Sequence, residues 1–306
     1  MRKILFSIGA IILCVSITSA HTSLIKGYDV HTNEQDAVIK TEKVAGNVYV
    51  LFGQGGNIGV SVGTDGLLMI DDQFANIADK IKAALKELGS DKPRFLFNTH
   101  WHGDHTGSNT VFGADSIIIA HTNVRKRLSA DTKLMGQDIK ATPAIGLPMI
   151  TYNESMSVYF NGEEVRAVHF KNGHTDGDTV LFFTKSNVVH LGDDFFAGRF
   201  PFVDLSSGGS VEGLAKNIGE LFKLIPANAK IIPGHGPVST PDDLKTYHQM
   251  LIDTTSIVRK KMKTKTLDAI KKEGLPEKYK EWGSGFIKSE AWIETIYKSY
   301  AGEMKK

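Results

Sequence analysis

The stretch Asn98-Thr-His-Trp-His-Gly-Asp-His-Thr-Gly107 decides how this chain is interpreted, because it places three imidazoles and one carboxylate within six residues. It follows directly after Arg94–Phe97, a short apolar run typical of a buried strand. Histidine and carboxylate ligands without a thiolate suit Zn²⁺, with Mn²⁺ or Fe²⁺ as alternatives. The stretch therefore predicts a metal site at the end of a strand.

The spacing within the stretch also carries information. His100, His102 and Asp104 share a period of two, so an extended backbone would project all three side chains to one side. His105 is out of phase and joins them only if the chain bends. Gly103 permits that bend.

Three later segments repeat the same context, in which an apolar run ends at a glycine-flanked histidine or aspartate. A hydrolytic zinc site needs more ligands than one turn supplies, together with an open position for water. These segments are Asn172-Gly-His-Thr175 after Val165–Phe170, Gly192-Asp193 after Asn187–Leu191, and Pro233-Gly-His-Gly236 after Lys230–Ile232.

In this order the ligand candidates resemble the signature His-x-His-x-Asp-His, distal His, Asp and final His of the metallo-β-lactamase fold superfamily, over roughly residues 43 to 250. The resemblance implies an α/β fold, an αββα sandwich of two mixed β-sheets flanked by helices, and two Zn²⁺ per chain. It implies one metal held by His100, His102 and His174 and a second held by Asp104, His105 and His235, with Asp193 bridging both.

Differences between this ligand set and those of individual branches of the superfamily reduce the number of branches that the chain can resemble. The branch that binds its second zinc through cysteine is excluded, because Asp193 stands at that position and the only cysteine is Cys14. The full ligand set is similar to that of thiolesterases, lactonases, phosphodiesterases and broad-specificity hydrolases of the superfamily. Asp194 competes with Asp193 as the bridging ligand, and the position directly after Gly192 favours Asp193.

The function expected from this set is that of an exported dinuclear zinc hydrolase of amide, ester or lactone bonds, with β-lactamase activity as a main or side reaction. A metal-bridging hydroxide would be the nucleophile, and Asp104 would be the catalytic residue that orients it and handles its proton. Two alternatives stay open: a mononuclear iron persulfide dioxygenase-like enzyme, and a periplasmic zinc-binding protein without catalysis.

The first twenty residues, Met1–Ala20, have a basic start, an apolar middle and small residues at the end, which predicts a cleavable signal peptide and a periplasmic or secreted protein. The alternative is a retained membrane anchor. Its apolar part, Ile4–Ile17, is short for a span of about 20 residues, so no stable membrane insertion is expected after cleavage.

Composition and length fit one catalytic domain at residues 21–262, followed by a helical extension at 263–306 that packs on it through Trp282 and Trp292. Without Arg2 and Lys3, the 36 basic residues become 34 and balance the 34 acidic ones. This balance argues against nucleic acid as a partner and favours a small-molecule substrate. The sequence makes no prediction of oligomeric state.

Hydrophobic periodicity predicts alternating strands and helices. Strands are expected at Val44–Phe52, Asn57–Gly63, Leu67–Asp71, Ser116–Ala120, Ser157–Phe160, Val165–Phe170, Thr179–Phe183 and Val188–Leu191, and helices at Ala75–Leu88, Thr122–Leu128, Val211–Leu224 and Leu244–Met262. Residues 129–153 show no regular period and are either a pocket-lining segment or a surface insertion. Gln54–Asn57 is interpreted as a hairpin flap over the site.

Overall fold

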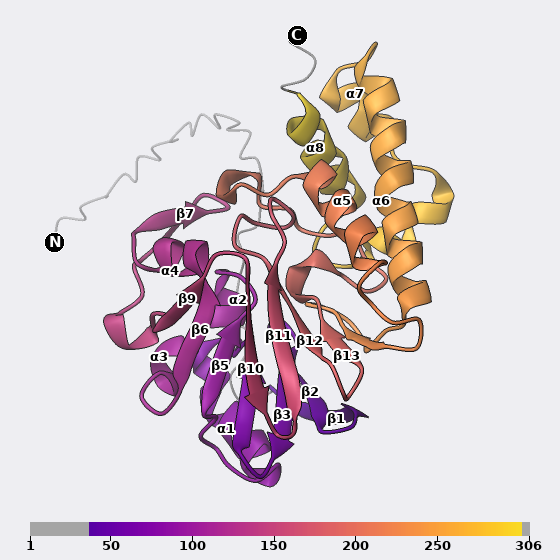
Figure 1. Cartoon of the computed structure of the whole chain (residues 1–306). Coiled ribbons are helices and arrows are strands. Elements are labelled where there is room, and N and C mark those ends of the chain that lie inside the picture. Colours follow the sequence, from indigo (N-terminus) through magenta and orange to yellow (C-terminus); the bar gives the residue numbers. More distant parts are fainter. Residues whose placement is uncertain (1–36, 302–306) are drawn as a thin grey trace, which may run out of the picture.

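A computed structural model describes residues 37–301, which form two β-sheets packed face to face with helices on the outer faces (Figure 1). The larger sheet runs in the order β1 (Lys40–Ala45), β2 (Val48–Phe52), β3 (Ile58–Gly63), β4 (Gly66–Ile70), β5 (Phe95–Asn98), β6 (Ile117–His121) and β9 (Ile150–Tyr152). Strands β1 to β4 pair antiparallel to one another, and from β4 onwards the pairs β4–β5, β5–β6 and β6–β9 are parallel.

The smaller sheet runs in the order β10 (Ser155–Phe160), β11 (Glu163–His169), β12 (Thr179–Phe183), β13 (Val188–His190) and β14 (Lys230–Ile232). The first four of its strands are antiparallel, and β14 pairs with β13 in parallel. Both sheets are therefore mixed, and the predicted αββα sandwich is confirmed.

The helices flank this sandwich. They are α1 (Ala78–Glu87), α2 (Gly103–Thr106), α3 (Asn109–Phe112), α4 (Thr122–Leu128), α5 (Val211–Leu221), α6 (Pro241–Met262), α7 (Leu267–Glu273) and α8 (Ser289–Tyr300). Short 3₁₀ turns are η2 (Ala75–Ile77), η3 (Ala144–Gly146), η4 (Gly192–Asp194), η5 (Leu205–Ser207), η6 (Glu277–Tyr279) and η7 (Glu281–Ser284), and β7 (Thr132–Leu134) pairs with β8 (Gln137–Ile139) as a separate hairpin.

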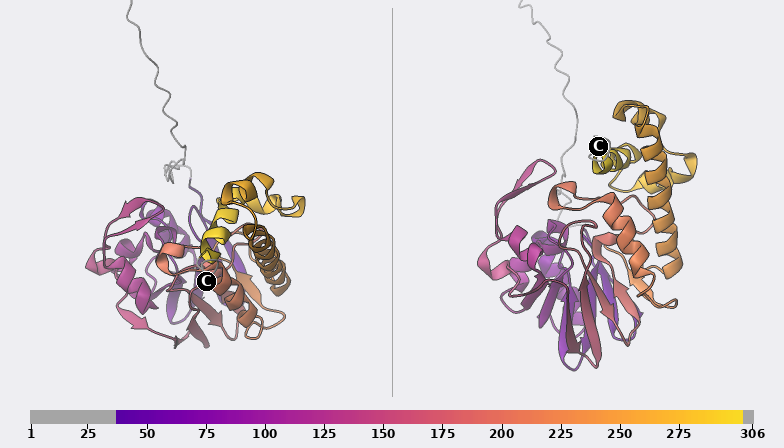
Figure 2. Two further views of the ribbon diagram at one scale, coloured as in Figure 1. Left: turned by 90° about the horizontal axis from the view of Figure 1, so that it is seen from above. Right: turned by 45° about the horizontal axis from the view of Figure 1, so that its top comes forward.

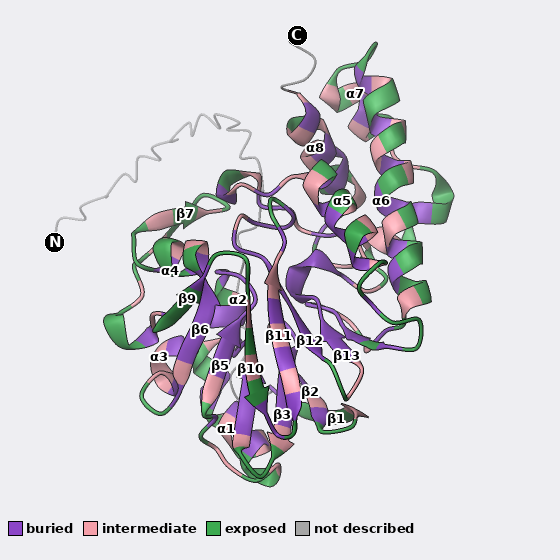
Figure 3. Ribbon diagram, viewed as in Figure 1, coloured by how far each residue is buried: buried purple, intermediate pink, exposed green. Residues whose placement is uncertain are grey.

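Strand alternation divides the larger sheet's side chains between two apolar layers. In β4, Leu68 and Ile70 face the layer between the two sheets, whereas Leu67 and Met69 face the layer under α1. Because the sheet is covered on both faces, its strands are apolar at successive positions rather than at alternate ones. The central strands β3, β4 and β12 accordingly carry long buried stretches, whereas the edge strand β10 is largely exposed (Figure 3).

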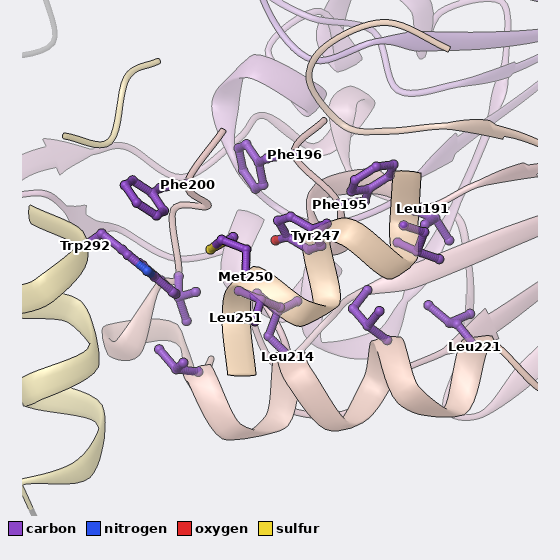
Figure 4. Packing of buried hydrophobic residues seen from close by; sticks show 14 of the residues in the cluster. Leu191, Phe195, Phe196, Phe200, Leu214, Leu221, Tyr247, Met250, Leu251 and Trp292 are labelled. Atoms are coloured by element: carbon purple, nitrogen blue, oxygen red, sulfur yellow. The ribbon is translucent and has the colours of Figure 1, made fainter. Parts of the chain in front are cut away.

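A third apolar layer joins the smaller sheet to the helices that follow it. Leu214 of α5, Tyr247 of α6 and Trp292 of α8 lie in one cluster with Phe195 and Phe200 (Figure 4). Two further views show α7 and α8 on the outer side of the sandwich, next to α6 (Figure 2).

The C-terminal region takes part in this third layer. Trp292 is fully buried, and Trp282 packs against the same cluster, as expected from the sequence. The division into a domain at 21–262 and an extension at 263–306 stays a prediction, because the cluster continues across residue 262 without a break. The predicted signal peptide, residues 1–20, lies outside the described residues. Between residues 37 and 301, no helix combines the length and the apolar character needed to cross a bilayer.

Two sequence interpretations of local structure were wrong. The single strand expected at Val44–Phe52 is part of a hairpin, in which β1 and β2 reverse at Gly46, whose φ of 51° suits glycine. Residues 129–153, expected to be irregular, contain the β7–β8 hairpin, η3 and β9. That hairpin turns at Met135 and Gly136, both with positive φ, and its strands are too short and too polar to give a period.

Candidate metal centre

The structure brings all seven predicted ligands to one edge of the sandwich. Their donor atoms form a first group, His100, His102, His174 and Asp193, and a second group, Asp104, His105 and His235; within each group these atoms lie within 4.8 Å of one another. The membership of the groups agrees with the predicted division between two metals, and ligation itself stays a prediction.

Four separate chain segments supply these side chains. His100 and His102 follow β5, and α2, which carries Asp104 and His105, begins at Gly103 (Figure 1). The extended backbone expected from the period of two is not found, because the chain bends at residues 99–101 and the aspartate is delivered by a helical turn. The remaining ligands follow β11, β13 and β14, so strand ends of both sheets meet here.

In the first group, outer hydrogen bonds determine which ring nitrogens carry hydrogen. His174 Nδ1 lies 2.7 Å from the Phe202 carbonyl oxygen, which can only accept, so Nδ1 donates and Nε2 keeps a lone pair. His102 Nε2 lies 3.1 Å from Asp204 Oδ2. Burial opposes ionisation of Asp204, but hydrogen bonds from His102 and Ser206 hold its pKa well below the usual range. The carboxylate therefore accepts from Nε2, and His102 Nδ1 keeps its lone pair.

Asp71 fixes the position of a ring hydrogen in two other histidines, His105 and His100. Its Oδ2 accepts from His105 Nδ1 at 2.7 Å and from the Thr99 hydroxyl at 2.7 Å. Because that hydroxyl hydrogen is used, Thr99 Oγ1 accepts from His100 Nδ1 at 3.1 Å. His100 Nε2 is consequently left as an acceptor. Burial opposes protonation of His105, but the carboxylates of Asp193 and Asp104 outweigh it and raise the pKa of His105 well above its usual range.

The ring nitrogens of the first group that keep a lone pair lie close to one another. His102 Nδ1 lies 3.1 Å from His100 Nε2 and 2.9 Å from His174 Nε2, although none of these three nitrogens has a hydrogen to share. Three acceptors at such distances repel one another unless a cation lies among them. The residues of the first group thus fit a metal ion.

Asp193 links the two groups. Its Oδ2 lies 3.5 Å from His174 Nε2, whereas its Oδ1 lies 3.1 Å from His105 Nε2 and 3.4 Å from His235 Nε2. Oδ1 is buried and has no donor in hydrogen-bonding geometry. A buried carboxylate oxygen without a donor is unfavourable, and a cation would satisfy it. Asp194, the competing candidate, belongs to neither group and is buried beside Asp178.

Charge differs between the two groups. Burial lowers the pKa of His174 to about 4, so its ring is neutral at pH 7. Burial also opposes protonation of His235, but the carboxylates of Asp193 and Asp104 outweigh it and raise the pKa of His235 to about 9. A metal entering the second group therefore has to displace a proton, which makes its binding weaker in acid.

The loop Gln54–Asn57, expected to be a flap, is hydrogen-bonded to two of the segments that carry the ligand candidates. Gly56 N donates to the Asp104 carbonyl at 2.9 Å, and Asn57 N donates to the Gly234 carbonyl at 2.7 Å. Gln73 Nε2 donates to the Gly56 carbonyl at 2.6 Å. The loop is thus part of the support of the second group.

We expect Gly56→Ala to displace His105 and to lower the amount of metal that the second group binds. A Cβ at residue 56 would lie 2.1 Å from His105 Cε1, and overpacking of this kind costs about 1–3 kcal/mol. Elemental analysis and thermal unfolding measure both effects. Gly103→Ala is the matched control, because its Cβ would meet no atom within 4 Å. Equal metal content in both variants would contradict the expectation.

The segment 195–202, which follows Asp193, contains four phenylalanines. Two of them pack in the core, and two lie beside the metal-ligand candidates. Phe195 and Phe200 are buried in the third apolar layer. Phe196 stacks on His235 with ring centroids 5.1 Å apart, and Phe202 contacts the rings of His102 and His174. Phe196 and Phe202 therefore form apolar walls beside the ligands.

Within residues 37–301, the histidines outside the ligand set make structural contacts. His190 Nε2 donates to the Asn57 carbonyl, and His248 Nε2 donates to the Ala215 carbonyl. His121 and His169 stack with ring centroids 3.7 Å apart, where β6 and β11 approach each other.

Sequence reasoning missed the residues that hold the histidines in place. Asp71 directly follows β4, so the strand-end pattern used for the ligands could have found it. Asp204 and the Phe202 carbonyl follow no strand, and no local signal marks them.

Comparison with known proteins agrees with this architecture. The model of the "Metallo-beta-lactamase superfamily" matches residues 43–263. A hydroxyacylglutathione hydrolase of Nitrosococcus oceani is 29% identical over 145 residues, which are 46% of this chain and 47% of that relative. The chain spans about half the length of the curated relatives it matches.

Among solved structures, a metallo-beta-lactamase from Pontibacter korlensis has a TM-score of 0.58 at 14% identity, over 70% of this chain and 98% of that one. The sec-alkylsulfatase Pisa1 from Pseudomonas sp. has a TM-score of 0.63 at 15% identity, over 86% of this chain and 50% of that one. At such identities these likenesses show the fold alone. Because the family model covers well over half of the 306 residues and the two-sheet architecture agrees with it, the chain belongs to the metallo-beta-lactamase superfamily.

Proposed function

We propose that this protein is an exported dinuclear zinc hydrolase that cleaves an amide, ester or lactone bond, with β-lactams among the candidate substrates. The observation that carries the proposal is the placement of Asp193, whose two carboxylate oxygens face different groups of histidines. One carboxylate shared in this way is suited to hold two cations a few ångströms apart. Members of the superfamily are mostly hydrolases, which supports the reaction class.

Bound zinc would supply a Lewis acid that lowers the pKa of water towards neutrality and polarises the bond under attack. The protein's own contribution is to hold the ligands in one tautomer and to manage a proton. Asp104 suits the second task, because its Oδ2 lies 3.2 Å from His235 Nε2 and its side chain remains 15% exposed. We assign it the role of orienting the nucleophile and accepting its proton.

The exposed side of the centre indicates where substrate arrives. His100, His102, His105 and His174 are buried, whereas the side chain of His235 is 23% exposed. Substrate would therefore approach over Asp104 and His235, against the ring of Phe196. An apolar group next to the scissile bond fits this wall.

The remaining expectations belong to the same proposal. The hydroxyacylglutathione hydrolase relative supports ester-type chemistry, and the lactamase fold neighbours support a test on β-lactams. The basic and apolar pattern of residues 1–20 supports export to the periplasm or beyond. We infer a small-molecule substrate, no nucleic-acid partner and no stable membrane insertion after cleavage.

Elemental analysis of the mature protein, combined with a substrate panel, tests the proposal. We expect two zinc ions per chain and turnover of at least one β-lactam, homoserine lactone, thioester or carboxylic ester. Phosphodiesters serve as the comparison class. One iron per chain with persulfide oxidation would favour the dioxygenase alternative. Tight zinc binding without turnover of any substrate would favour the non-catalytic one.

A further inference from the structure

We propose that Asp204 is a positioning residue that selects the tautomer of His102 and thereby sets the affinity of the first group for its metal. The inference rests on the proposed function only in taking His102 Nδ1 as the atom that faces the metal. Asp204 lies 102 residues along the chain from that histidine and is 3% exposed.

The two oxygens of Asp204 have different tasks, and both accept. Oδ2 accepts from His102 Nε2 at 3.1 Å. Oδ1 accepts from Ser206 N at 3.0 Å and from Ser207 N at 3.1 Å, with the Ser206 hydroxyl as a further donor. A carboxylate can satisfy donors on both sides, and no neutral side chain of the same shape can do so.

The backbone around Asp204 fixes where this carboxylate lies. Asp204 N donates to the His174 carbonyl at 2.9 Å, and Gly209 N donates to the Asp204 carbonyl at 3.0 Å. A Cβ at residue 209 would lie 2.2 Å from the His174 carbonyl oxygen, so glycine allows this close approach. The segment that carries Asp204 is therefore held against the segment that carries His174.

A second anchor holds the same segment from the side of α4. Asp176 N donates to the Ser207 carbonyl at 2.9 Å. The Asp176 carboxylate in turn forms a two-point ion pair with Arg127, at 2.7 and 2.8 Å. Asp204 thus meets His102 from a rigid support, as a residue that orients a ligand needs to.

Asp204→Asn is a sharp variant because an amide keeps the shape but offers only one acceptor. If that oxygen stays with Ser206 N and Ser207 N, the amide nitrogen faces His102 Nε2 and donates to it. The ring hydrogen then moves to Nδ1, which lies 2.9 Å from His174 Nε2. An asparagine in place of an aspartate beside a histidine selects the wrong tautomer in this way.

Nitrogen-15 NMR of the metal-free protein reads the tautomer directly, with a His102→Gln variant to identify the signal. We expect hydrogen on Nε2 of His102 in the wild type and on Nδ1 in Asp204→Asn. Zinc titration should show about 10–100-fold weaker binding to the first group in that variant, with a smaller change at the second. Ser206→Ala is the matched control, because it removes one donor to Oδ1 and leaves the carboxylate and both backbone donors in place.

Several results would overturn the inference. Hydrogen on Nδ1 of His102 in the wild type would do so, and this measurement stands even if Asp204→Asn fails to fold. Unchanged tautomer or unchanged zinc affinity in a folded Asp204→Asn would do so as well. A protein that shows the predicted tautomers and zinc affinities but hydrolyses nothing supports the role of Asp204 and counts against the hydrolase proposal alone.

Discussion

Replacing Asp104 with alanine will abolish the proposed hydrolysis while leaving a metal partly bound to the first group. The first group does not include this residue, whereas the second group keeps only His105 and His235. Loss of the second cation and of the proton acceptor removes several kcal/mol of transition-state stabilisation, so turnover should fall on the order of 10³-fold or more. Steady-state kinetics and zinc analysis of the same preparation measure both effects.

Two further variants show whether the effect belongs to one group. His105→Ala should behave like Asp104→Ala, since it empties the same group of a ligand. Asp193→Ala should lower the zinc content further than either, because its oxygens face both groups. Undiminished activity in Asp104→Ala would refute the role assigned to this residue.

Replacing Trp292 with alanine will lower the free energy of unfolding by about 3–5 kcal/mol, the usual cost of removing a large buried aromatic side chain. Trp292 is fully buried in α8, stacks on Phe200 at 5.8 Å and donates from Nε1 to Thr254 Oγ1 at 3.0 Å. Chemical denaturation measures the change. Phe286→Ala, at a ring that is 55% exposed, is the control and should change stability by less than about 1 kcal/mol.

The same substitution tests how the C-terminal helices support the site. Phe200, against which Trp292 packs, lies in the sequence between Phe196 and Phe202, the two apolar walls of the metal centre. Phe200 N also donates to the Trp282 carbonyl at 2.8 Å. We therefore expect a folded Trp292→Ala to bind substrate more weakly as well. A variant with full stability would contradict the packing described for α8.

Much of the fold follows from local pattern. Helix α4 has the bounds predicted from its apolar spacing, and so has strand β12. Periodicity failed where strands were short or where a turn lay inside an apolar run, as at Gly46 and at Met135. At these points positive backbone φ angles decide the direction of the chain, and hydrophobicity carries no trace of them.

The sequence by itself determined the identity and the order of the seven metal-ligand candidates, because imidazole and carboxylate chemistry at strand ends is a local property. Tertiary structure alone brought these candidates together in space and decided which acceptors select their tautomers. Asp71 meets His105 across 34 positions, and Asp204 meets His102 across 102. Such contacts form only when separate strands and loops pack together, so no stretch of sequence records them.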